Sequence, residues 1–378
     1  MNRREFSFLV AGTVVSGALP KCSAIVASAQ AVADTSEISP QTDELYRRWL
    51  VLDCNSAPPL EEKLPLPQSD LDMARNSGVS VVKMTLGGFG SDFAGTVDEI
   101  AWVQRLIEMH PDYFLQVRLA EDMERAHREK KMGIIFSFEG VSMLEDKVDR
   151  IEVFRNLGVR VMQLSYNGKS VFGAGVLEPN AGGLTTLGQD AVKKMNELGV
   201  AIDLSHSNPK TTTDAMAASR KPVIISHAGC SAIHAHPRNK TDEQIRTLAD
   251  KGGVMGIYDL PFLAPSPRQP TVEDYMAHVE RALKVGGEDH VGVGSDAGVS
   301  PFDTSPKALA EFKKSQEARV KAGAAAPEED RYPYVVGLNT PLRLEVITDQ
   351  LLKRGYSPRV TEKVVGANFA RVLREIWS

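Results

Sequence analysis

After residue 48, the chain repeats one pattern of hydrophobic and polar positions. Each repeat begins with a short apolar run rich in β-branched residues, continues through a polar or glycine-containing turn, and ends in a longer amphipathic segment. The apolar runs predict eight β-strands, at residues 49–55, 79–87, 132–140, 159–167, 200–206, 222–229, 252–260 and 290–298. The amphipathic segments predict helices, several of them opening with a Thr or Ser cap, at residues 97–110, 142–157, 186–198, 241–251, 271–286, 339–353 and 358–377.

Strands that alternate with helices pair in parallel, so the pattern predicts an α/β fold. Eight such units fit a (β/α)8 TIM barrel better than an open, doubly wound sheet, and no G-x-G-x-x-G sequence opens the first unit. We expect residues 34–378 to form one barrel domain with C-terminal helices. An insertion is expected near residues 303–336, where alanine, proline and charged residues are frequent. Three roles stay open for it: a lid over the pocket, a subunit contact that would make a homodimer, or a plain surface insertion.

The first residues, MNRREFSFLVAGTVVSGALP, place Arg3 and Arg4 ahead of a short apolar run. Candidate cleavage sites follow at residues 27–29 and 31–33. A membrane anchor is the weaker interpretation, because the run is too short to span a bilayer and is interrupted by glycine and proline. We therefore expect residues 1–33 to be a twin-arginine type export signal, and the mature protein to be periplasmic or secreted without a transmembrane span.

The composition changes this picture little. The chain of 378 residues is 42% hydrophobic and 25% charged, which is enough apolar material for one large domain. Its formal net charge of −5, without a Lys/Arg-rich block, argues against a nucleic-acid partner and favours a small molecule or peptide. Of three cysteines, Cys22 falls in the export signal, so Cys54 and Cys230 could form one disulfide at most.

Polar side chains stand at the ends of the predicted strands, where the loops of a barrel meet around one pocket. His206 and His227 follow similar runs, DLSH and IISH, and Glu139 ends the run IIFSFE. Two imidazoles and a carboxylate form a ligand set suited to Zn²⁺, with a position left for a water that the metal could activate. Asp296 ends the last strand. Asp203 could orient an imidazole, or serve only a turn or an ion pair.

The loop after the sixth predicted strand, SAIHAHPRNKTDE, emerges beside His227. Arg238 in this loop is suited to bind a substrate carboxylate through paired hydrogen bonds, and His236 is a further candidate for substrate contact.

With these motifs the chain resembles the membrane dipeptidases, the renal dipeptidase-like metallopeptidases, over most of its mature length. The resemblance rests on FSFEG, LSYNG, IDLSHSN, SHAGCSAIHAHPRNKTDEQI, GGVMGI, TVEDYMAHVERALKVGGEDHVGVGSD and RGYSPRVTEKVVGANFARVLREIW. It implies a barrel of amidohydrolase type with two zinc ions bridged by Glu139. It also implies that His206 and His227 hold one ion, that Asp296 holds the other, and that Arg238 binds the dipeptide carboxylate.

The resemblance fails at the end of the first strand. The family's second metal also takes a His-x-Asp pair there, whereas this chain has Asn55 and Ala57. Asn55 would be a weak ligand and Ala57 offers none, so we expect one zinc ion and regard a second as doubtful. Asp296 would then serve as general base. Cys54 as a substitute ligand, and a Cys54–Cys230 disulfide, are left open as alternatives.

Two more positions bear on the substrate. Tyr166 stands where animal family members have a histidine, and either donates to the oxyanion or forms a wall of the pocket. Its neighbour Asn167 is a candidate substrate contact. After Asp296 the sequence GSDAG departs from the family's GxDFDG, which puts dipeptide specificity in question.

Three functions follow from these residues. The leading one is a zinc-dependent hydrolase that cleaves an amide bond in a dipeptide-like carboxylate substrate. The second is a single-metal hydrolase or lyase that acts on a non-peptide compound. The third is a non-catalytic binding protein with a degenerate site, although a degenerate pocket has no need for four convergent ligands.

Overall fold

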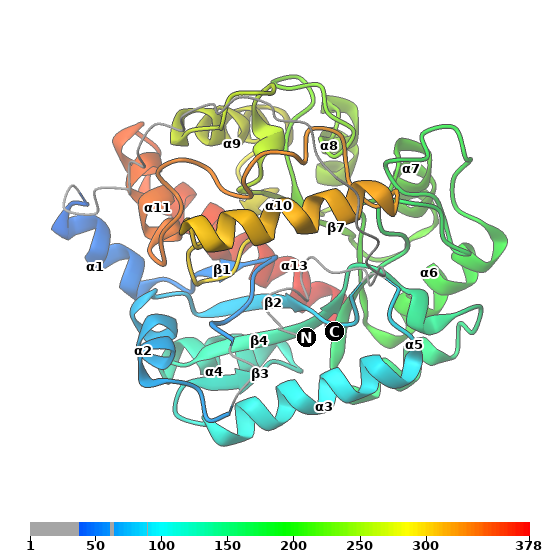
Figure 1. Cartoon of the computed structure of the whole chain (residues 1–378), viewed down its shortest axis with the longest axis horizontal. Helices are drawn as coiled ribbons and strands as arrows, with labels where there is room; N and C mark the ends of the chain where they lie inside the picture. The colour runs from blue at the N-terminus through cyan, green and yellow to red at the C-terminus, as the bar shows by residue number, and fades with distance from the viewer. Residues whose placement is uncertain (1–37, 61–63, 89) are drawn as a thin grey trace.

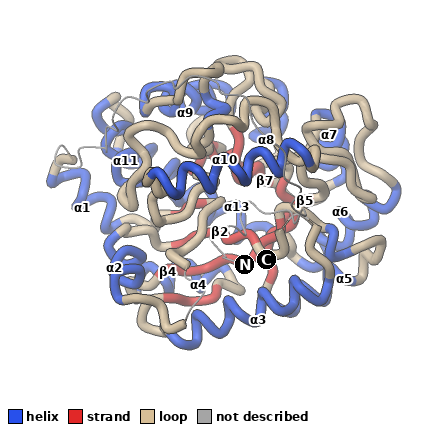
Figure 2. Tube along the Cα trace, in the orientation of Figure 1, coloured by secondary structure: helices blue, strands red, loops and turns tan. Residues whose placement is uncertain are grey.

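The structure is a computed structural model that describes residues 38–60, 64–88 and 90–378. The predicted export signal, residues 1–33, lies outside the described residues. Figure 2 shows strands in the interior of the molecule and helices on its outside. Within the described ranges, no helix combines the length and the apolar character that a membrane crossing requires.

Eight parallel strands in the described part of the chain close into a ring. The ring runs β1, β2, β4, β5, β6, β7, β8 and β9, and β9 pairs back to β1 through Asp53 and Val293. The strands are β1 (Leu52–Asp53), β2 (Val81–Thr85), β4 (Met132–Phe138), β5 (Val159–Gln163), β6 (Ala201–Asp203), β7 (Ile224–Ala228), β8 (Val254–Ile257) and β9 (Val291–Val293). Each lies within a predicted strand, and the prediction of a (β/α)8 TIM barrel is confirmed.

A further short strand, β3 (Phe114–Gln116), was not predicted and does not belong to the ring. It pairs with the first residues of β4, Met132 to Ile134, whereas β5 pairs with Phe136 to Phe138. Three residues are too few to produce a recognisable alternation, which is why the pattern missed it.

Most predicted helices are present. They are α3 (Phe93–Met109), α5 (Arg150–Leu157), α6 (Thr186–Leu198), α8 (Asp242–Asp250), α9 (Val272–Gly286) and α11 (Arg343–Lys353). Helix α3 begins four residues earlier than predicted, α6 has the predicted bounds, and the others are shorter. The predicted helix at 142–157 is wrong in its first half: a short turn, η3 (Ser142–Leu144), ends at Glu145, whose φ of 53° is incompatible with a right-handed helix. The helix predicted at 358–377 is divided by a π-helical turn into α12 (Pro358–Glu362), η5 (Lys363–Ala367) and α13 (Asn368–Trp377).

Five other helices, counted over the described ranges, were not singled out from the sequence. They are α1 (Pro40–Arg48), α2 (Gln68–Asn76), α4 (Ala120–Arg128), α7 (Pro209–Ala218) and α10 (Pro306–Lys321), and a short turn, η4 (Pro261–Leu263), follows β8. Several begin at a capping side chain, as α7 does where Asn208 accepts a hydrogen bond from the N–H of Thr211 at 2.7 Å.

The hydrophobic core has two parts. The larger part fills the space between the strands and the surrounding helices. The smaller part lies inside one end of the barrel, where Leu52, Val81 and Ile135 pack with Phe369 and Leu373 of α13. Gly292 is required there, because a Cβ atom would lie 2.4 Å from the ring of Phe369. Helix α13 thus seals this end of the barrel, and polar chemistry is confined to the other.

Helix α10 belongs to the predicted insertion at residues 303–336. In Figure 1 it lies across the front of the strands, and its residues Phe312, Gln316 and Arg319 line the cavity described below. The carbonyl of Ala324, just after α10, accepts a hydrogen bond from Asn167 Nδ2 at 3.1 Å. The insertion therefore covers the pocket of its own chain.

Candidate metal centre

A cavity of about 640 Å³ opens at the carboxyl ends of the strands. Its polar floor includes Asn55, Glu139, His206, Arg238 and Asp296. Its walls carry large apolar side chains from several elements, among them Leu60, Met84, Trp102, Leu260, Phe262, Phe302, Phe312 and Tyr334. The barrel therefore brings the predicted strand-end residues into one pocket, as its topology requires.

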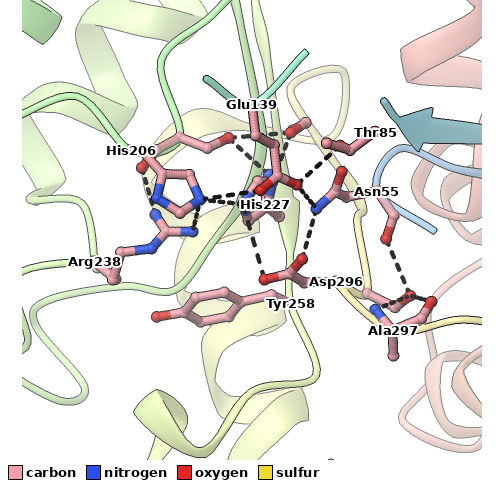
Figure 3. A network of polar contacts seen from close by, with 12 residues as sticks. Asn55, Thr85, Glu139, His206, His227, Arg238, Tyr258, Asp296 and Ala297 are labelled. Carbon is pink, nitrogen blue, oxygen red and sulfur yellow. Dashed lines mark hydrogen bonds and ion pairs between the residues drawn. The ribbon is translucent and has the colours of Figure 1, made fainter. Parts of the chain in front are cut away.

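The imidazoles of His206, which lines this cavity, and of His227, which is buried behind it, meet through their Nε2 atoms (Figure 3). Their Nε2 atoms are 3.0 Å apart, and Glu139 Oε2 is 3.8 Å from His206 Nε2. One ligand atom from each of the three residues lies within 4.8 Å of the other two. All three side chains can thus reach one small ion.

The proton of His206 is fixed on Nδ1 by its neighbour Asn167. The Nδ2 group of Asn167 donates to the carbonyl of Ala324, so its Oδ1 must face His206, 2.7 Å from Nδ1. A carbonyl oxygen only accepts, and Nδ1 therefore carries the hydrogen. The Nε2 atom of His206 is left with its lone pair.

The proton of His227 is fixed in the same position by Ser226 and Asp203. The hydroxyl of Ser226 donates to Asp203 Oδ2 at 2.5 Å, which uses its one hydrogen. It lies 2.7 Å from His227 Nδ1 and must accept from that nitrogen. The Nε2 atom of His227 is left with its lone pair as well.

These two lone pairs point at each other across 3.0 Å. Burial and the nearby charge of Arg238 hold the pKa of His206 and of His227 well below the usual 6.5, so both rings are neutral at pH 7. Two neutral nitrogen lone pairs at that distance repel unless a positive group lies between or beside them, and the Arg238 guanidinium, which donates to His206 Nε2 at 3.1 Å, offsets part of this repulsion. The arrangement therefore fits a cation such as Zn²⁺, held by the two nitrogens and Glu139.

Arg238 is almost fully buried beside this pair. One of its terminal nitrogens donates to the carbonyl of Ser205 at 2.5 Å, and the other lies 3.1 Å from His206 Nε2. The guanidinium is thus held at the floor of the cavity, next to the candidate ion site.

Asn55 is turned so that it donates to the carboxylates. Its Nδ2 donates to Glu139 Oε1 at 2.9 Å and to Asp296 Oδ1 at 2.8 Å, while its Oδ1 accepts from Lys83 Nζ at 2.7 Å. Asn55 was predicted as a weak metal ligand, but in this arrangement its oxygen points away from the carboxylates. Lys83 was missed, although a lysine within the apolar run VVKMT is an unusual feature that could have directed attention to it.

Asp296 follows β9 with a φ of 56°, a conformation that aspartate adopts more readily than most residues. Its Oδ2 lies 3.9 Å from His227 Nε2. Burial and the charge of Glu139 raise its pKa to about 7, against the lowering effect of Arg238 and Lys83. Its carboxyl group can therefore take up or release a proton near neutral pH.

Two predicted substrate contacts remain: Tyr166 lines the cavity, whereas His236 is not among its lining residues. The ring of Tyr166 stacks on His206 with centroids 4.3 Å apart, and burial raises its pKa to about 12, so its phenol is protonated. His236 stacks on Phe262 and its Nε2 lies 2.7 Å from the carbonyl of Pro327. His236 thus ties its loop to the insertion beside the pocket.

Cys54 and Cys230 are both buried free thiols. Cys54 packs in the core cluster that contains α13, on the side away from the cavity, and burial raises its pKa well above the ordinary value. The alternative of a Cys54–Cys230 disulfide is therefore wrong, and Cys54 is not among the three residues whose ligand atoms converge at the candidate ion site.

Comparison with known protein families gives a match to the family described as membrane dipeptidase (peptidase family M19), over residues 41–319. Among curated proteins, Dipeptidase tcpJ of Claviceps purpurea is 31% identical over 284 residues, which cover 74% of this chain and 60% of that protein. Dipeptidase verJ of Clonostachys rogersoniana is 27% identical, with 74% and 65% covered. The chain thus spans less than two thirds of the length of these two relatives.

Two solved structures extend the comparison. An amidohydrolase from Pseudomonas aeruginosa is 30% identical, with a TM-score of 0.78 over 89% of this chain and 99% of that one. A metallo peptidase from Rhodobacter sphaeroides, liganded with a phosphinate mimic of the dipeptide L-Ala-D-Ala, is 19% identical, with a TM-score of 0.71 over 87% and 99%. At that identity the second likeness shows a shared fold alone.

Proposed function

Because the chain belongs to the membrane dipeptidase family, peptidase family M19, we propose that it hydrolyses an amide bond in a dipeptide-like, carboxylate-bearing substrate with a single zinc ion. The observation that carries the proposal is the pair of Nε2 lone pairs of His206 and His227, 3.0 Å apart with Glu139 beside them. The relatives named as dipeptidases, and the amidohydrolase with the same fold, support the class of reaction.

Glu139, His206 and His227 would hold the ion. A zinc ion in such a site polarises the scissile carbonyl and activates a water for attack. Asn167 and the Ser226–Asp203 pair keep the two Nδ1 hydrogens in place, which keeps both Nε2 atoms available as ligands.

Asp296 serves as the proton acceptor. Its Oδ1 accepts a hydrogen bond from the Asn55 amide, and its Oδ2 lies on the side of His227, where it would be available to accept a proton from water. A carboxyl group with a pKa of about 7 can take the proton from water and return it to the leaving nitrogen at neutral pH.

Arg238 and Tyr166 orient the substrate. The guanidinium of Arg238 is fixed at the cavity floor by the carbonyl of Ser205, and its charge suits a substrate carboxylate. The protonated phenol of Tyr166, stacked on His206, suits donation to the oxyanion that forms during attack. The cavity of about 640 Å³ and its aromatic walls suit a small substrate with an apolar side chain.

A second candidate is a single-metal hydrolase or lyase on a non-peptide compound. Asn55 and Ala57 in place of a metal-binding pair, and Ala297 and Gly298 after Asp296, favour it because they alter the cleft floor. A third is a binding protein without turnover, which the four convergent side chains Glu139, His206, His227 and Asp296 argue against.

Metal analysis of the purified chain, combined with hydrolysis of a panel of dipeptides and N-acyl amino acids, tests these candidates. We expect one zinc ion per chain, and a hydrolysis activity that a chelator removes and added zinc restores. Absence of bound metal would rule out both enzymes. Bound metal without dipeptide turnover would favour the second candidate.

We also propose that the mature protein is periplasmic or secreted, on the twin-arginine pattern of residues 1–33. Fractionation of cells that express the full chain tests this proposal. Replacement of Arg3 and Arg4 by lysine should keep the protein in the cytoplasm, and unchanged export of that variant would contradict it.

A further inference from the structure

We propose, on the basis of the one-ion site above, that Lys83 is a positioning residue. It turns the Asn55 amide so that the N–H2 group fills the place between Glu139 and Asp296 that a second cation would otherwise occupy.

Lys83 lies in the middle of β2 and has no exposed surface. Its Nζ donates to Asn55 Oδ1 at 2.7 Å and to Ser137 Oγ at 3.2 Å, and lies 4.0 Å from Asp203 Oδ2. An ammonium group has only hydrogens to offer, so the amide must present its oxygen to Lys83. Lys83 thereby decides which end of Asn55 faces the cavity.

With its oxygen bound to Lys83, Asn55 directs both amide hydrogens at carboxylates. One goes to Glu139 Oε1 at 2.9 Å and the other to Asp296 Oδ1 at 2.8 Å. The other oxygens of these carboxylates lie nearer the imidazoles. Glu139 Oε2 is 3.8 Å from His206 Nε2, and Asp296 Oδ2 is 3.9 Å from His227 Nε2. Each carboxylate therefore has one oxygen towards the candidate ion and one towards the amide.

Glu139 and Asp296 are two acidic groups held close together in a largely buried site, and such a pair needs a positive partner. The Asn55 hydrogens supply donors, and the Lys83 ammonium behind the amide supplies the charge. A divalent ion at the same place would have to displace both hydrogen bonds and would lie one amide length from a buried ammonium. Repulsion between the two cations is strong where water is excluded. The Asn55 amide therefore excludes a second ion because it occupies the place between the two carboxylates, and Lys83 excludes it because its positive charge repels a cation.

Three variants of the chain test this inference through metal content, measured by mass spectrometry after equilibration with zinc and removal of unbound ions. Asn55→Asp is isosteric and replaces the donor with a carboxylate, so three carboxylates converge and the content should rise from one ion per chain to two. Lys83→Met releases the amide, which can then turn its oxygen towards Glu139 and Asp296. This variant should also admit a second ion, with weaker affinity that a zinc titration resolves.

Ser137→Ala is the matched control. It removes the other hydrogen bond of Lys83 and leaves the contact with Asn55 intact, so it should keep one ion per chain. Circular dichroism and thermal melting verify that each variant is folded. If Asn55→Asp does not fold, the Lys83→Met result decides.

The results separate the inference from the proposed function. One ion in both Asn55→Asp and Lys83→Met overturns the inference, as does a second ion in Ser137→Ala. A second ion in Asn55→Asp alone overturns the role of Lys83. Two ions in the unmodified chain overturn the inference and leave the hydrolase proposal standing, whereas no ion there overturns both.

Discussion

At the ends of β6 and β7, the buried carboxylate of Asp203 accepts hydrogen bonds from the backbone N–H of Ser226 at 3.0 Å and from its hydroxyl at 2.5 Å. At the ends of β1 and β9, Asp53 binds the N–H of Ser295 at 2.8 Å and its hydroxyl at 2.6 Å. In each case the next residue belongs to the candidate metal centre: His227 follows Ser226, and Asp296 follows Ser295. We call these two regions the imidazole side and the amide side.

The two sides have the same kind of hydrogen-bonded aspartate–serine pair, but one side offers nitrogen lone pairs and the other offers hydrogen-bond donors. The imidazole side presents the Nε2 lone pairs of two neutral imidazoles, one of which also accepts from the Arg238 guanidinium at 3.1 Å, and this set of nitrogens suits a cation. On the amide side, Asn55 already places hydrogens between two carboxylates, and Lys83 adds a positive charge. The comparison teaches that each hydrogen-bonded aspartate–serine pair fixes only the position of the residue that follows the serine. The chemistry of the residues on each side then decides whether that side suits an ion.

The largest expected effect comes from breaking the imidazole side. His227→Ala removes one of the proposed ligands, so we expect loss of bound metal and a fall in hydrolysis of roughly a thousandfold, since a metal ion supplies several kcal/mol of transition-state stabilisation. Metal content and steady-state kinetics measure both. His290→Ala is the matched control, because His290 does not belong to the cluster of Glu139, His206 and His227, and its Nδ1 lies 2.7 Å from the carbonyl oxygen of Gly253. Retention of metal by His227→Ala would contradict the assignment.

A second prediction compares the two supporting carboxylates. Asp203→Asn disturbs the hydrogen-bond chain to His227 Nδ1 and should weaken zinc affinity by about 10–100-fold. Asp53→Asn disturbs an equivalent network on the amide side, where no ion is proposed, and should leave zinc affinity unchanged. Competition with a chromophoric chelator measures both affinities. Equal losses in the two variants would show that the sides do not differ in ion binding.

The two sides should also respond oppositely to pH in chelator-treated protein. The pKa of Asp296 is raised from 3.8 to about 7, so its contribution to stability is complete below about pH 4 and declines as the pH rises to 7. His206 and His227 have lowered pKa values, so their contribution is complete above pH 6.5 and declines as the pH falls below it. Either slope is at most about 1.4 kcal/mol per pH unit for each group.

Urea unfolding between pH 4 and 8 measures these slopes. Asp296→Asn should remove the decline towards pH 7, and His206→Gln should reduce the decline on the acidic side. A wild-type profile that Asp296→Asn leaves unchanged would contradict the raised pKa of this carboxyl group.

The smallest expected effect concerns the two serines. Ser226→Ala and Ser295→Ala each remove a buried hydroxyl that is hydrogen-bonded to an aspartate, and each should cost about 1 kcal/mol of unfolding free energy. Urea unfolding in the presence of chelator measures both, and similar values would support the equivalence of the two aspartate–serine pairs. If only one of the two variants lost unfolding free energy, the two pairs would be alike in geometry but not in their contribution to stability.

The sequence predicted the barrel from its repeated pattern and the family from its motifs, and it predicted the convergence of Glu139, His206 and His227 from the geometry of a barrel. Parallel strands of a closed barrel end on the same side, so residues that end different strands must meet. The fold and the family are confirmed. Alternation along β2 places Lys83 on the same face as Val81, towards the barrel interior, and the lysine could have been noticed on that ground.

The roles of the two asparagines could not be read in this way. Asn55 was predicted as a weak ligand and Asn167 as a substrate contact, yet one donates to carboxylates and the other orients His206. An amide has an accepting and a donating end, and which end faces the cavity is set by Lys83 and by the carbonyl of Ala324, far away in sequence. Such roles depend on partners that periodicity does not identify.

The seam of the barrel joins β1 to β9, and α13 at the end of the chain seals the bottom. The ring cannot close until the ribosome has made β9, which follows β1 by about 240 residues. At roughly 5–20 residues per second, the β1 segment waits on the order of ten seconds or more for its partner strand. During that interval the unpaired edge of an apolar strand can pair with another chain, which favours aggregation.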